Sequence, residues 1–475
     1  MTQAQTVQIP KRLPLVVEPE NRNDSVKFDA RLVNAFIEFK KSDKGEAGET
    51  WIYERPGLDE QSRPPAGNAV GRGIFNWRGN IYSIFGATLY KDGVAVVGAV
   101  DTTNGVYRFD SCLGGTPKLE LGNGVEGYTY DSGGGLVNIT DGDFPSAFRK
   151  GWAYLDGTTY VLTPSAHILG SDINDPQSWD PLNDVLAQIE PDQGVALSKQ
   201  LVYVVALKEW TGEVFYDAGN STGSPLGRVE GAKVNWGCAS QDSVRDVGGQ
   251  LMWIGKTRIG PPEVIYLDGL KAEPVSTKPV ERLLQGVNFA TETVYSWTLR
   301  LQGHRFYITT FKNANLTLAF DIDERMWSQW TDTNGNYLPI VDSCTDDQLR
   351  NLLQHESNGR IYICSSDYAD DDGELIQVDI YTPNFDGGTR RRKQMNKLEI
   401  VSDQKAGGRL GIRVNDNDYD PTKWSEFRYV DMAQKDPYLT NCGTFTRRVH
   451  NFRFREPVRM PRIQAVEMQV DIGTL

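Results

Sequence analysis

The side chains that most often carry enzyme chemistry are few in this sequence and stand far apart. The histidines (His167, His304, His355 and His450) are isolated, and neither H-E-x-x-H nor another paired spacing of metal ligands occurs. No G-x-S-x-G motif is present, so the sharp turn that exposes a nucleophilic serine is not indicated. The pattern argues against zinc and serine hydrolases, and we predict no catalytic residue.

Two glycine-containing stretches have nearly the spacing of phosphate-binding loops but lack their surroundings. Residues 122–127 fit G-x-G-x-x-G, yet the Tyr-Thr-Tyr-Asp-Ser-Gly-Gly-Gly that follows is no helix. Without a helix N-terminus to hold a pyrophosphate, we interpret the stretch as a β-turn. Residues 255–257 (Gly-Lys-Thr) stand between predicted strands, with the preceding glycine one residue too far away. We therefore predict no cofactor.

Acidic residues cluster at two places. Asp416, Asp418 and Asp420 alternate along the chain, and residues 370–374 read Asp-Asp-Asp-Gly-Glu. Carboxylate oxygens are the ligands that calcium prefers, but neither cluster matches an EF-hand loop and acidic turns are common. We predict no metal. A glycosidase would need two carboxylates across a pocket, which the sequence neither shows nor excludes.

The charge is negative overall and unevenly distributed. The 475 residues carry a net charge of −13, which argues against a protein that grips nucleic acid by neutralising phosphates. From Gly388 onward there are 17 Lys and Arg against 11 Asp and Glu, a surplus of 6, so the first 387 residues carry −19. We therefore expect partners to recognise this difference in charge between the acidic first 387 residues and the basic C-terminal region.

Cysteines and hydropathy bear on the compartment. The five cysteines are scattered without any C-x-x-C, which is typical of free thiols in a reducing cytosol. No apolar run approaches the ~20 residues of a membrane helix, and the first residues lack the apolar segment of a signal peptide. We expect synthesis in the cytoplasm and no membrane span.

The sequence predicts mainly short β-strands, and these would hold the side chains of any site in place. Alternating segments end in Asp-Gly, Asn-Gly or Gly-Gly, which favour tight hairpins. Strands predicted to start near residues 201, 251, 305 and 361 recur every 50–55 residues, close to the period of propeller blades. A pair of β-sandwiches is the alternative, but it does not explain this spacing. One short helix is predicted over residues 277–286, between a capping Thr and a closing Gly.

The fold class that follows is all-β, a β-propeller-like body with further parts at both ends. Residues 1–72 are expected to form an N-terminal arm or partial blade, and residues 73–387 the propeller body. After residue 388 the sequence pattern changes from short strands with tight turns to longer alternating strands. This change predicts a C-terminal β-sandwich-like domain over residues 388–475.

Three stretches resemble a known family, the tail hub or packaged-DNA stabilisation protein of short-tailed bacteriophages. The first is residues 31–38 followed by residues 55–58, with the "R-x-V-N…P-G" signature. The second covers residues 144–157 and 170–180, and the third covers residues 453–467. The motif positions, to which the resemblance assigns structural roles, are Arg31, Asn34, Pro56, Gly57, Asp172, Asp175, Pro176 and Trp179.

The resemblance implies a structural virion protein of the tail, with no enzymatic activity and no cofactor. Members of the family form a homo-hexameric nozzle below the adaptor ring that hangs from the portal. They close the channel after packaging, carry tail needle, fibre or tailspike proteins, and let double-stranded DNA pass during ejection without sequence-specific binding. Six copies would total about −78, and lumen carboxylates would repel phosphates over roughly 8–10 Å at physiological salt.

Two charged segments are candidates for such roles. We predict a lumen-facing or rim loop at Asp370, Asp371, Asp372 and Glu374, against the alternative of a solvated outer turn. The basic run Arg390, Arg391, Arg392 and Lys393 is predicted to dock an acidic neighbour such as the adaptor or the adjacent subunit, against that of a plain surface run.

Two other classes of function stay open on the sequence. One is a glycan-binding or glycan-cleaving propeller, in which Trp179, Trp253 and Trp330 would stack on sugars; the alternative for them is blade core. The other is a cytosolic propeller scaffold outside any virus, which the family-like stretches disfavour.

Overall fold

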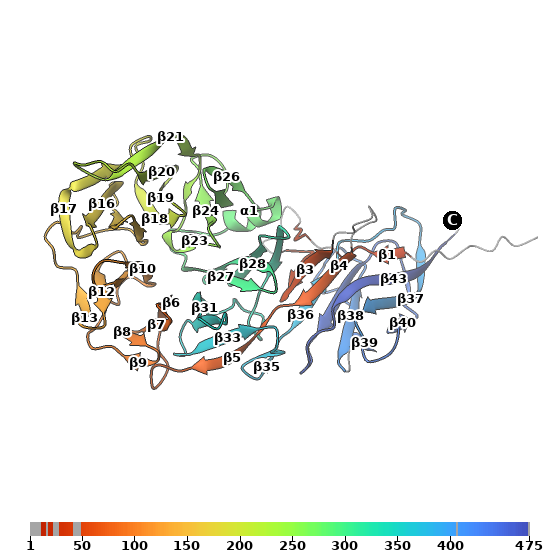
Figure 1. The fold of residues 1–475 in the computed structure, drawn as a ribbon. Helices are drawn as coiled ribbons and strands as arrows, with labels where there is room; N and C mark the ends of the chain where they lie inside the picture. Colours follow the sequence, from red (N-terminus) through yellow and green to blue (C-terminus); the bar gives the residue numbers. More distant parts are fainter. Residues whose placement is uncertain (1–10, 16–17, 22–27, 41–48, 405–406, 474–475) are drawn as a thin grey trace, which may run out of the picture. The chain divides into compact units, whose positions relative to one another are not determined.

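The computed structural model describes residues 11–15, 18–21, 28–40, 49–404 and 407–473. Over these residues the chain is mostly β-strand with one α-helix, as predicted (Figure 1). It divides into two compact units built from interleaved segments. Unit 1 comprises residues 1–59, 316–338 and 365–475, and unit 2 comprises residues 60–315 and 339–364. The consecutive domains expected from the sequence, 1–72, 73–387 and 388–475, stay a prediction.

Unit 2 is a β-propeller, which confirms the predicted body. Antiparallel sheets follow one another around a common centre, and the first strand of each lies innermost (Figure 1). The ring closes where β31 lies against β6. Its strands are β6 (Gly71–Trp77), β7 (Asn80–Phe85), β8 (Thr88–Lys91), β9 (Val94–Ala95), β10 (Arg108–Cys112), β11 (Lys118–Gly122), β12 (Gly127–Asp131), β13 (Gly135–Asn138), β14 (Ala153–Leu155), β15 (Thr158–Leu162), β16 (His167–Asp172), β17 (Asp175–Leu186), β18 (Gly194–Gln200), β19 (Tyr203–Lys208), β20 (Gly212–Asp217), β21 (Leu226–Val234), β22 (Gly237–Cys238), β23 (Arg245–Asp246), β24 (Leu251–Lys256), β25 (Glu263–Asp268), β26 (Lys271–Pro274), β27 (Val294–Leu301), β28 (His304–Phe311), β31 (Ile340–Thr345), β32 (Asn351–His355) and β33 (Ile361–Ser365).

Turn chemistry explains why the chain reverses so often in unit 2. Asp156 and Gly157, between β14 and β15, have φ of 47° and 99°, the positive values that a two-residue hairpin loop needs. Residues 122–127, the G-x-G-x-x-G match, link β11 to β12 and form a turn as predicted. The strand expected to start near residue 201 begins at Tyr203 instead, because Leu201 takes a φ of 52° and turns the chain before β19.

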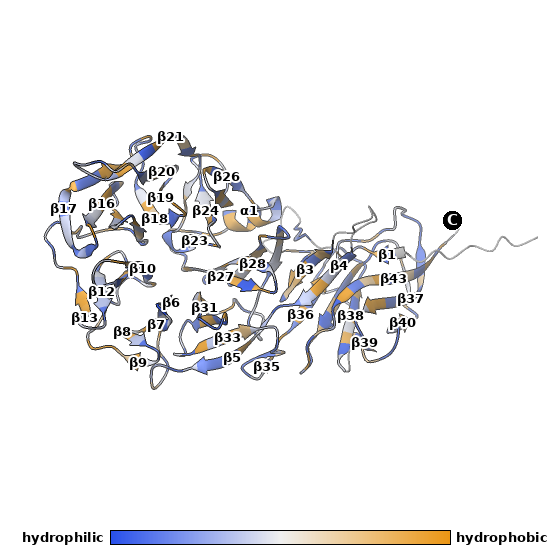
Figure 2. Cartoon of the chain, in the orientation of Figure 1, coloured by the Kyte–Doolittle hydropathy of each residue, from blue (hydrophilic) through white to orange (hydrophobic). Residues whose placement is uncertain are grey.

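The apolar residues of unit 2 are buried between neighbouring sheets. Trp253 of β24 and Ile265 of β25 pack with Val205 of β19 in one such layer, and all three are fully buried. Burial of a strand on both faces removes the strict alternation of polar and apolar residues, and Figure 2 shows mixed colouring along the strands. The hydrophobic effect at these layers holds the ring together.

The predicted helix is present as α1 (Lys278–Gln285), between Thr277 and Gly286 and with a proline in its first turn, but the predicted cap is not made, because the side chain of Thr277 forms no capping hydrogen bond. Its buried residues are Val280, Leu283 and Leu284, which the i, i+3, i+4 spacing places on one face. Within the described residues no helix is long and apolar enough to cross a membrane.

Unit 1 contains a β-sandwich, as predicted for the C-terminal residues, but N-terminal strands complete it. In one sheet β37 pairs with β43, which also takes β1 and β4; in the other, β2, β36, β42, β38 and β39 lie in that order. Side chains from both, such as Ile400 and Phe452, form one core. Its strands are β1 (Lys11–Leu13), β2 (Arg31–Val33), β3 (Ala35–Lys40), β4 (Glu49–Glu54), β29 (Leu316–Asp321), β30 (Met326–Gln329), β34 (Asp370–Asp371), β35 (Glu374–Leu375), β36 (Val378–Tyr381), β37 (Lys393–Ser402), β38 (Arg409–Asn415), β39 (Arg428–Asp431), β40 (Tyr438–Thr440), β41 (Thr444–Phe445), β42 (Val449–Phe454) and β43 (Ile463–Ile472), while β5 (Gly57–Ser62) crosses the boundary between the units.

Candidate functional site

The propeller encloses a central cavity of about 270 Å³. Its lining comes from the innermost strands and the segments that lead into them, and it combines charged and polar side chains with apolar ones such as Ile74 and Phe109. Three cations, Arg108, Lys150 and Arg245, line it together with the carboxylates of Asp246 and Asp342. Because these residues come from separate sheets, the charges meet only when the ring is closed.

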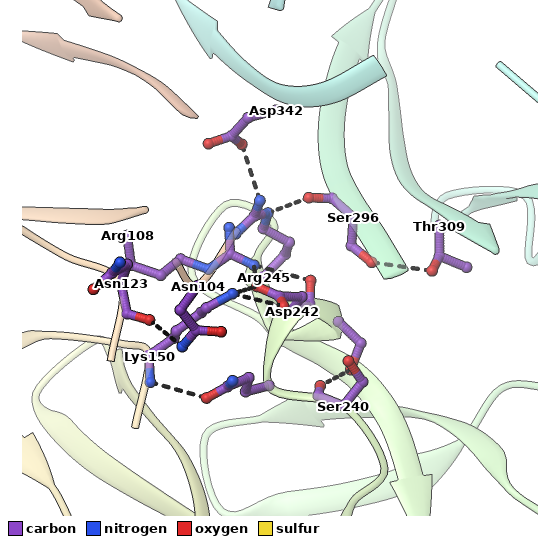
Figure 3. Close-up of polar contacts among 12 residues, drawn as sticks. Asn104, Arg108, Asn123, Lys150, Ser240, Asp242, Arg245, Ser296, Thr309 and Asp342 are labelled. Atoms are coloured by element: carbon purple, nitrogen blue, oxygen red, sulfur yellow. Dashed lines mark hydrogen bonds and ion pairs between the residues drawn. The ribbon is translucent and has the colours of Figure 1, made fainter. Parts of the chain in front are cut away.

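Asp242, in the 3₁₀ turn η1 (Gln241–Ser243), joins two of these cations (Figure 3). The Nζ of Lys150 lies 3.1 and 3.0 Å from the two carboxylate oxygens of Asp242. The Nη2 of Arg108 donates to the backbone carbonyl of Asp242 at 2.9 Å and to its Oδ1 at 3.4 Å. One carboxylate thus links the segments that carry β10, β14 and β23.

Arg245 of β23 extends the network toward the sheets on its other side. Its Nη2 donates to Oδ1 of Asp342 on β31 at 3.0 Å, and its Nε donates to the carbonyl of Ser296 on β27 at 2.5 Å. Asp246, the next residue, instead accepts the backbone N–H of Gly249 at 2.6 Å within its own turn. The three cations therefore share two carboxylates, those of Asp242 and Asp342.

Burial and charge act in opposite directions on these groups. Burial by itself would raise the pKa of Asp242, but Lys150 and Arg108 more than offset it, so the pKa is lowered. The pKa of Arg108 is lowered to about 10, chiefly by burial and then by the like charge of Arg245. The carboxylate of Asp242 acts in the opposite direction and offsets only part of this. Both directions leave Asp242 and Arg108 charged at neutral pH.

Two carboxylates behind the lining, the half-buried Asp110 and the fully buried Glu120, lie opposite each other on β10 and β11. Asp110 accepts the backbone N–H of Tyr154 at 2.9 Å, and Glu120 accepts the hydroxyl of Thr159 at 2.7 Å. Burial, reinforced by the charge of Asp110, raises the pKa of Glu120 to about 8, and burial raises that of Asp110 to about 6. Neither lines the cavity, so they are not placed as a glycosidase pair across a pocket.

The motif residues near the N-terminus form a buried polar cluster in unit 1. Asn34, at a φ of 55°, donates through Nδ2 to Oγ1 of Thr331 at 2.8 Å and accepts Nε of Arg55 at 2.9 Å. The guanidinium of Arg55 is 1% exposed and forms a bidentate pair with Asp371, at 3.0 and 2.5 Å. The pairing of Arg55 with Asp371 could not be predicted from the sequence, because the two residues are 316 positions apart.

The contacts of Gly57 and Arg31 explain why these residue types stand at their motif positions. A Cβ at Gly57 would lie 2.4 Å from the carbonyl oxygen of Asp370, so only glycine fits against that loop. The guanidinium of Arg31 stacks 4.1 Å from the ring centre of Tyr381. Pro56 offers its carbonyl to Nη1 of Arg55 at 2.9 Å.

The second motif is a bulged connection between β16 and β17 in unit 2. Ser178 donates to the carboxylate of Asp172 at 2.7 Å, and Asp175 pairs with Lys118 of the preceding sheet at 3.0 Å. Trp179 is buried and donates its indole N–H to the carbonyl of Pro176 at 3.0 Å. The segment therefore ties two sheets together.

The acidic segment 370–374 is a small hairpin, β34 and β35. Asp372 and Glu374 are exposed and Asp370 is half-buried, while Asp371 is turned inward onto Arg55. Asp416 and Asp418 of the other cluster pair with Arg448 and Arg447. Among the described residues there is no group of three or more metal-ligating side chains placed to hold an ion.

The basic run at residues 390–393 also contains both exposed and buried side chains. Arg390, Arg391 and Arg392 are exposed, but Lys393 is 2% exposed and donates to the carbonyls of Thr389, Arg391 and Thr446 at 2.7–2.8 Å. Its ammonium is therefore bound within unit 1, and docking would fall to the three arginines.

The tryptophans considered for glycan stacking are interior residues. Trp179, Trp253 and Trp330 are 4%, 0% and 1% exposed, so none presents a ring face to solvent. The interpretation as blade core is the one that the structure supports, and no observation favours the glycan alternative.

Comparisons with known proteins give one family and a set of distant folds. The family model described as "Bacteriophage P22 Gp10, beta-propeller" matches residues 12–337, more than two thirds of the chain. No curated protein matches. Similar solved structures include the N-terminal domain of Nup159 (9% identity, 66% of this chain and 95% of that chain, TM-score 0.37), a putative hybrid two-component system's extracellular domain from B. thetaiotaomicron (9%, 88% and 61%, 0.45) and virginiamycin B lyase from Staphylococcus aureus (8%, 65% and 98%, 0.41).

Proposed function

We propose, because the chain belongs to the bacteriophage P22 Gp10 β-propeller family, that it is the hexameric tail hub of a short-tailed phage. Membership makes it a structural phage protein of the DNA-stabilisation class with a place in the virion. The proposal adds that six copies form a nozzle below the adaptor ring and portal. This nozzle closes the channel over packaged DNA, carries needle, fibre or tailspike proteins, and conducts the genome on ejection.

The charge distribution supports a channel that does not bind DNA. Six chains at −13 each would carry about −78, and carboxylates on a lumen would repel phosphates within a Debye length. The exposed Asp372 and Glu374, with the half-buried Asp370, are the residues proposed for the rim. Asp371 contributes instead to the internal pair with Arg55.

The exposed arginines at 390, 391 and 392 are the proposed contact with an acidic neighbour. They precede β37, and their backbone is fixed by the buried ammonium of Lys393. A fixed backbone lowers the entropy lost when exposed side chains are ordered at an interface.

The test is negative-stain microscopy of the purified protein, alone and mixed with the portal–adaptor complex of its phage. We expect a six-fold tube in the mixture; monomers in both samples would refute the tail-hub proposal. A variant with Arg390, Arg391 and Arg392 changed to Glu should lose the tube. Its matched control changes the exposed Lys423 and Lys435 of unit 1 to Glu. Equal assembly of the two variants would refute the docking role, provided that both unfold at the wild-type temperature.

A further inference from the structure

We propose that the central cavity of the propeller is a binding site for a small oxyanion, a phosphate or carboxylate group held by Arg108, Lys150 and Arg245. The proposal goes beyond the structural role, because it assigns a ligand to the interior of unit 2. It rests on two cations that share one carboxylate, an unused donor, and the size of the cavity.

The arrangement of the charges favours an anion beside Arg108 and Lys150. These two cations share the single carboxylate of Asp242, whereas Arg245 has its own partner in Asp342. The carboxylate of Asp246 accepts the N–H of Gly249 in its own turn. An apolar ligand would leave these charged groups without compensation.

Arg108 has a donor to offer. Its Nη2 is used by Asp242, whereas its Nη1 is buried and has no hydrogen-bond partner among the residues that the structure describes. Buried polar groups are almost always satisfied, so a donor without a partner beside a polar cavity points to a ligand. A guanidinium is the side chain best matched to carboxylate and phosphate oxygens.

The surroundings of the cavity fit the same chemistry. Thr298 also lines it, and its hydroxyl can donate to an oxygen atom of a small anion, whereas the hydroxyl of Ser343 already donates to the carbonyl of Thr298. The volume of about 270 Å³ is far above the ~15 Å³ that one water requires on a comparable measure. Because the lining comes from several sheets, an anion bound there would crosslink the ring and raise its thermal stability.

The experiment is a titration of the full chain with inorganic phosphate, and separately with acetate, at constant ionic strength set with chloride. Isothermal calorimetry gives the affinity, and thermal unfolding gives the linked stabilisation. We expect saturable binding of one phosphate per chain. Weak, non-saturable stabilisation by phosphate would mean an adventitious ion or a general salt effect only, and would overturn the proposal.

Two substitutions test whether phosphate binds in the central cavity. Arg108→Gln should weaken phosphate binding about tenfold or more, the scale of one charge-assisted hydrogen bond. Arg78→Gln, at an exposed arginine of the same unit outside the cavity, is the matched control and should leave the affinity unchanged. Equal binding by these two variants would refute the assignment.

A second variant keeps the test decisive if Arg108→Gln does not fold. Asp342→Asn removes a carboxylate from the lining and leaves Arg245 without its counter-charge, so phosphate should bind more tightly than to the wild type. Unchanged or weaker binding to Asp342→Asn would overturn the proposal independently. Comparing the phosphate and acetate titrations then shows which oxyanion the cavity prefers.

Discussion

Glu120→Gln should stabilise the protein at alkaline pH, although it removes a charged residue. Glu120 is fully buried between β11 and the neighbouring sheet, and burial with the nearby Asp110 raises its pKa to about 8 from the ordinary 4.5. In the unfolded chain the group ionises near pH 4.5, so between pH 4.5 and 8 the folded state binds more protons. Stability must therefore fall as pH rises across this window.

The magnitude follows from the size of the shift. Each pH unit between the two pKa values costs about 1.4 kcal/mol, so ionisation of Glu120 costs the fold about 4–5 kcal/mol by pH 8. Gln keeps a carbonyl oxygen to accept the hydroxyl of Thr159, and it cannot ionise. We expect the free energy of unfolding of Glu120→Gln minus that of the wild type to rise by about 1.4 kcal/mol per pH unit between pH 5 and 8.

Urea unfolding at pH 5, 6, 7 and 8 measures this difference. Glu126→Gln is the matched control, because Glu126 lies in the turn after β11 and its carboxylate accepts an exposed hydrogen bond from Asn138. Its difference from the wild type is the reference against which the slope of Glu120→Gln is judged. A flat profile for Glu120→Gln would show that Glu120 ionises normally in the folded protein and would refute the reasoning.

Three further outcomes follow from the contacts. Asp242→Asn should lower the free energy of unfolding by about 3–5 kcal/mol in urea, because it leaves buried Lys150 without its counter-charge; the wild-type advantage should be lost as pH falls below about 4, since the pKa of Asp242 is lowered. Gly57→Ala should cost about 1–3 kcal/mol in thermal unfolding, because its Cβ would meet the carbonyl of Asp370; an unchanged midpoint would contradict that contact. Lys393→Met should cost about 1–3 kcal/mol, because three carbonyls lose their donor, whereas Arg391→Gln at the exposed neighbour should change stability by less than about 0.5 kcal/mol.

Local features of the chain were predictable because they depend on a few neighbouring residues. The Asp-Gly turn at residues 156–157 forms the expected hairpin, since these two residue types accept positive φ. Thr277 and Gly286 bound the expected helix, and the tryptophans at strand positions are buried. The spacing of strands and the motif stretches also led to the correct fold class and family.

Pairings between distant residues were not predictable, because nothing in the local sequence marks them. Asp371 and Lys393 were counted among exposed charged segments, yet the fold turns one onto Arg55 and surrounds the other with carbonyls. Neither residue differs in type or local pattern from the exposed neighbours beside it. Only the chain's path decides which member of a charged run is desolvated.

Local turn chemistry, strand periodicity and recognisable motifs were therefore enough to predict the hairpins, the helix, the propeller body and the family. The tertiary structure alone decided the interleaving of the two units and the charges of the central cavity. Arg108, Lys150 and Arg245 lie far apart in sequence and carry no motif. They meet because closing the ring brings the innermost strands together, where low solvent access makes each missing or surplus charge count.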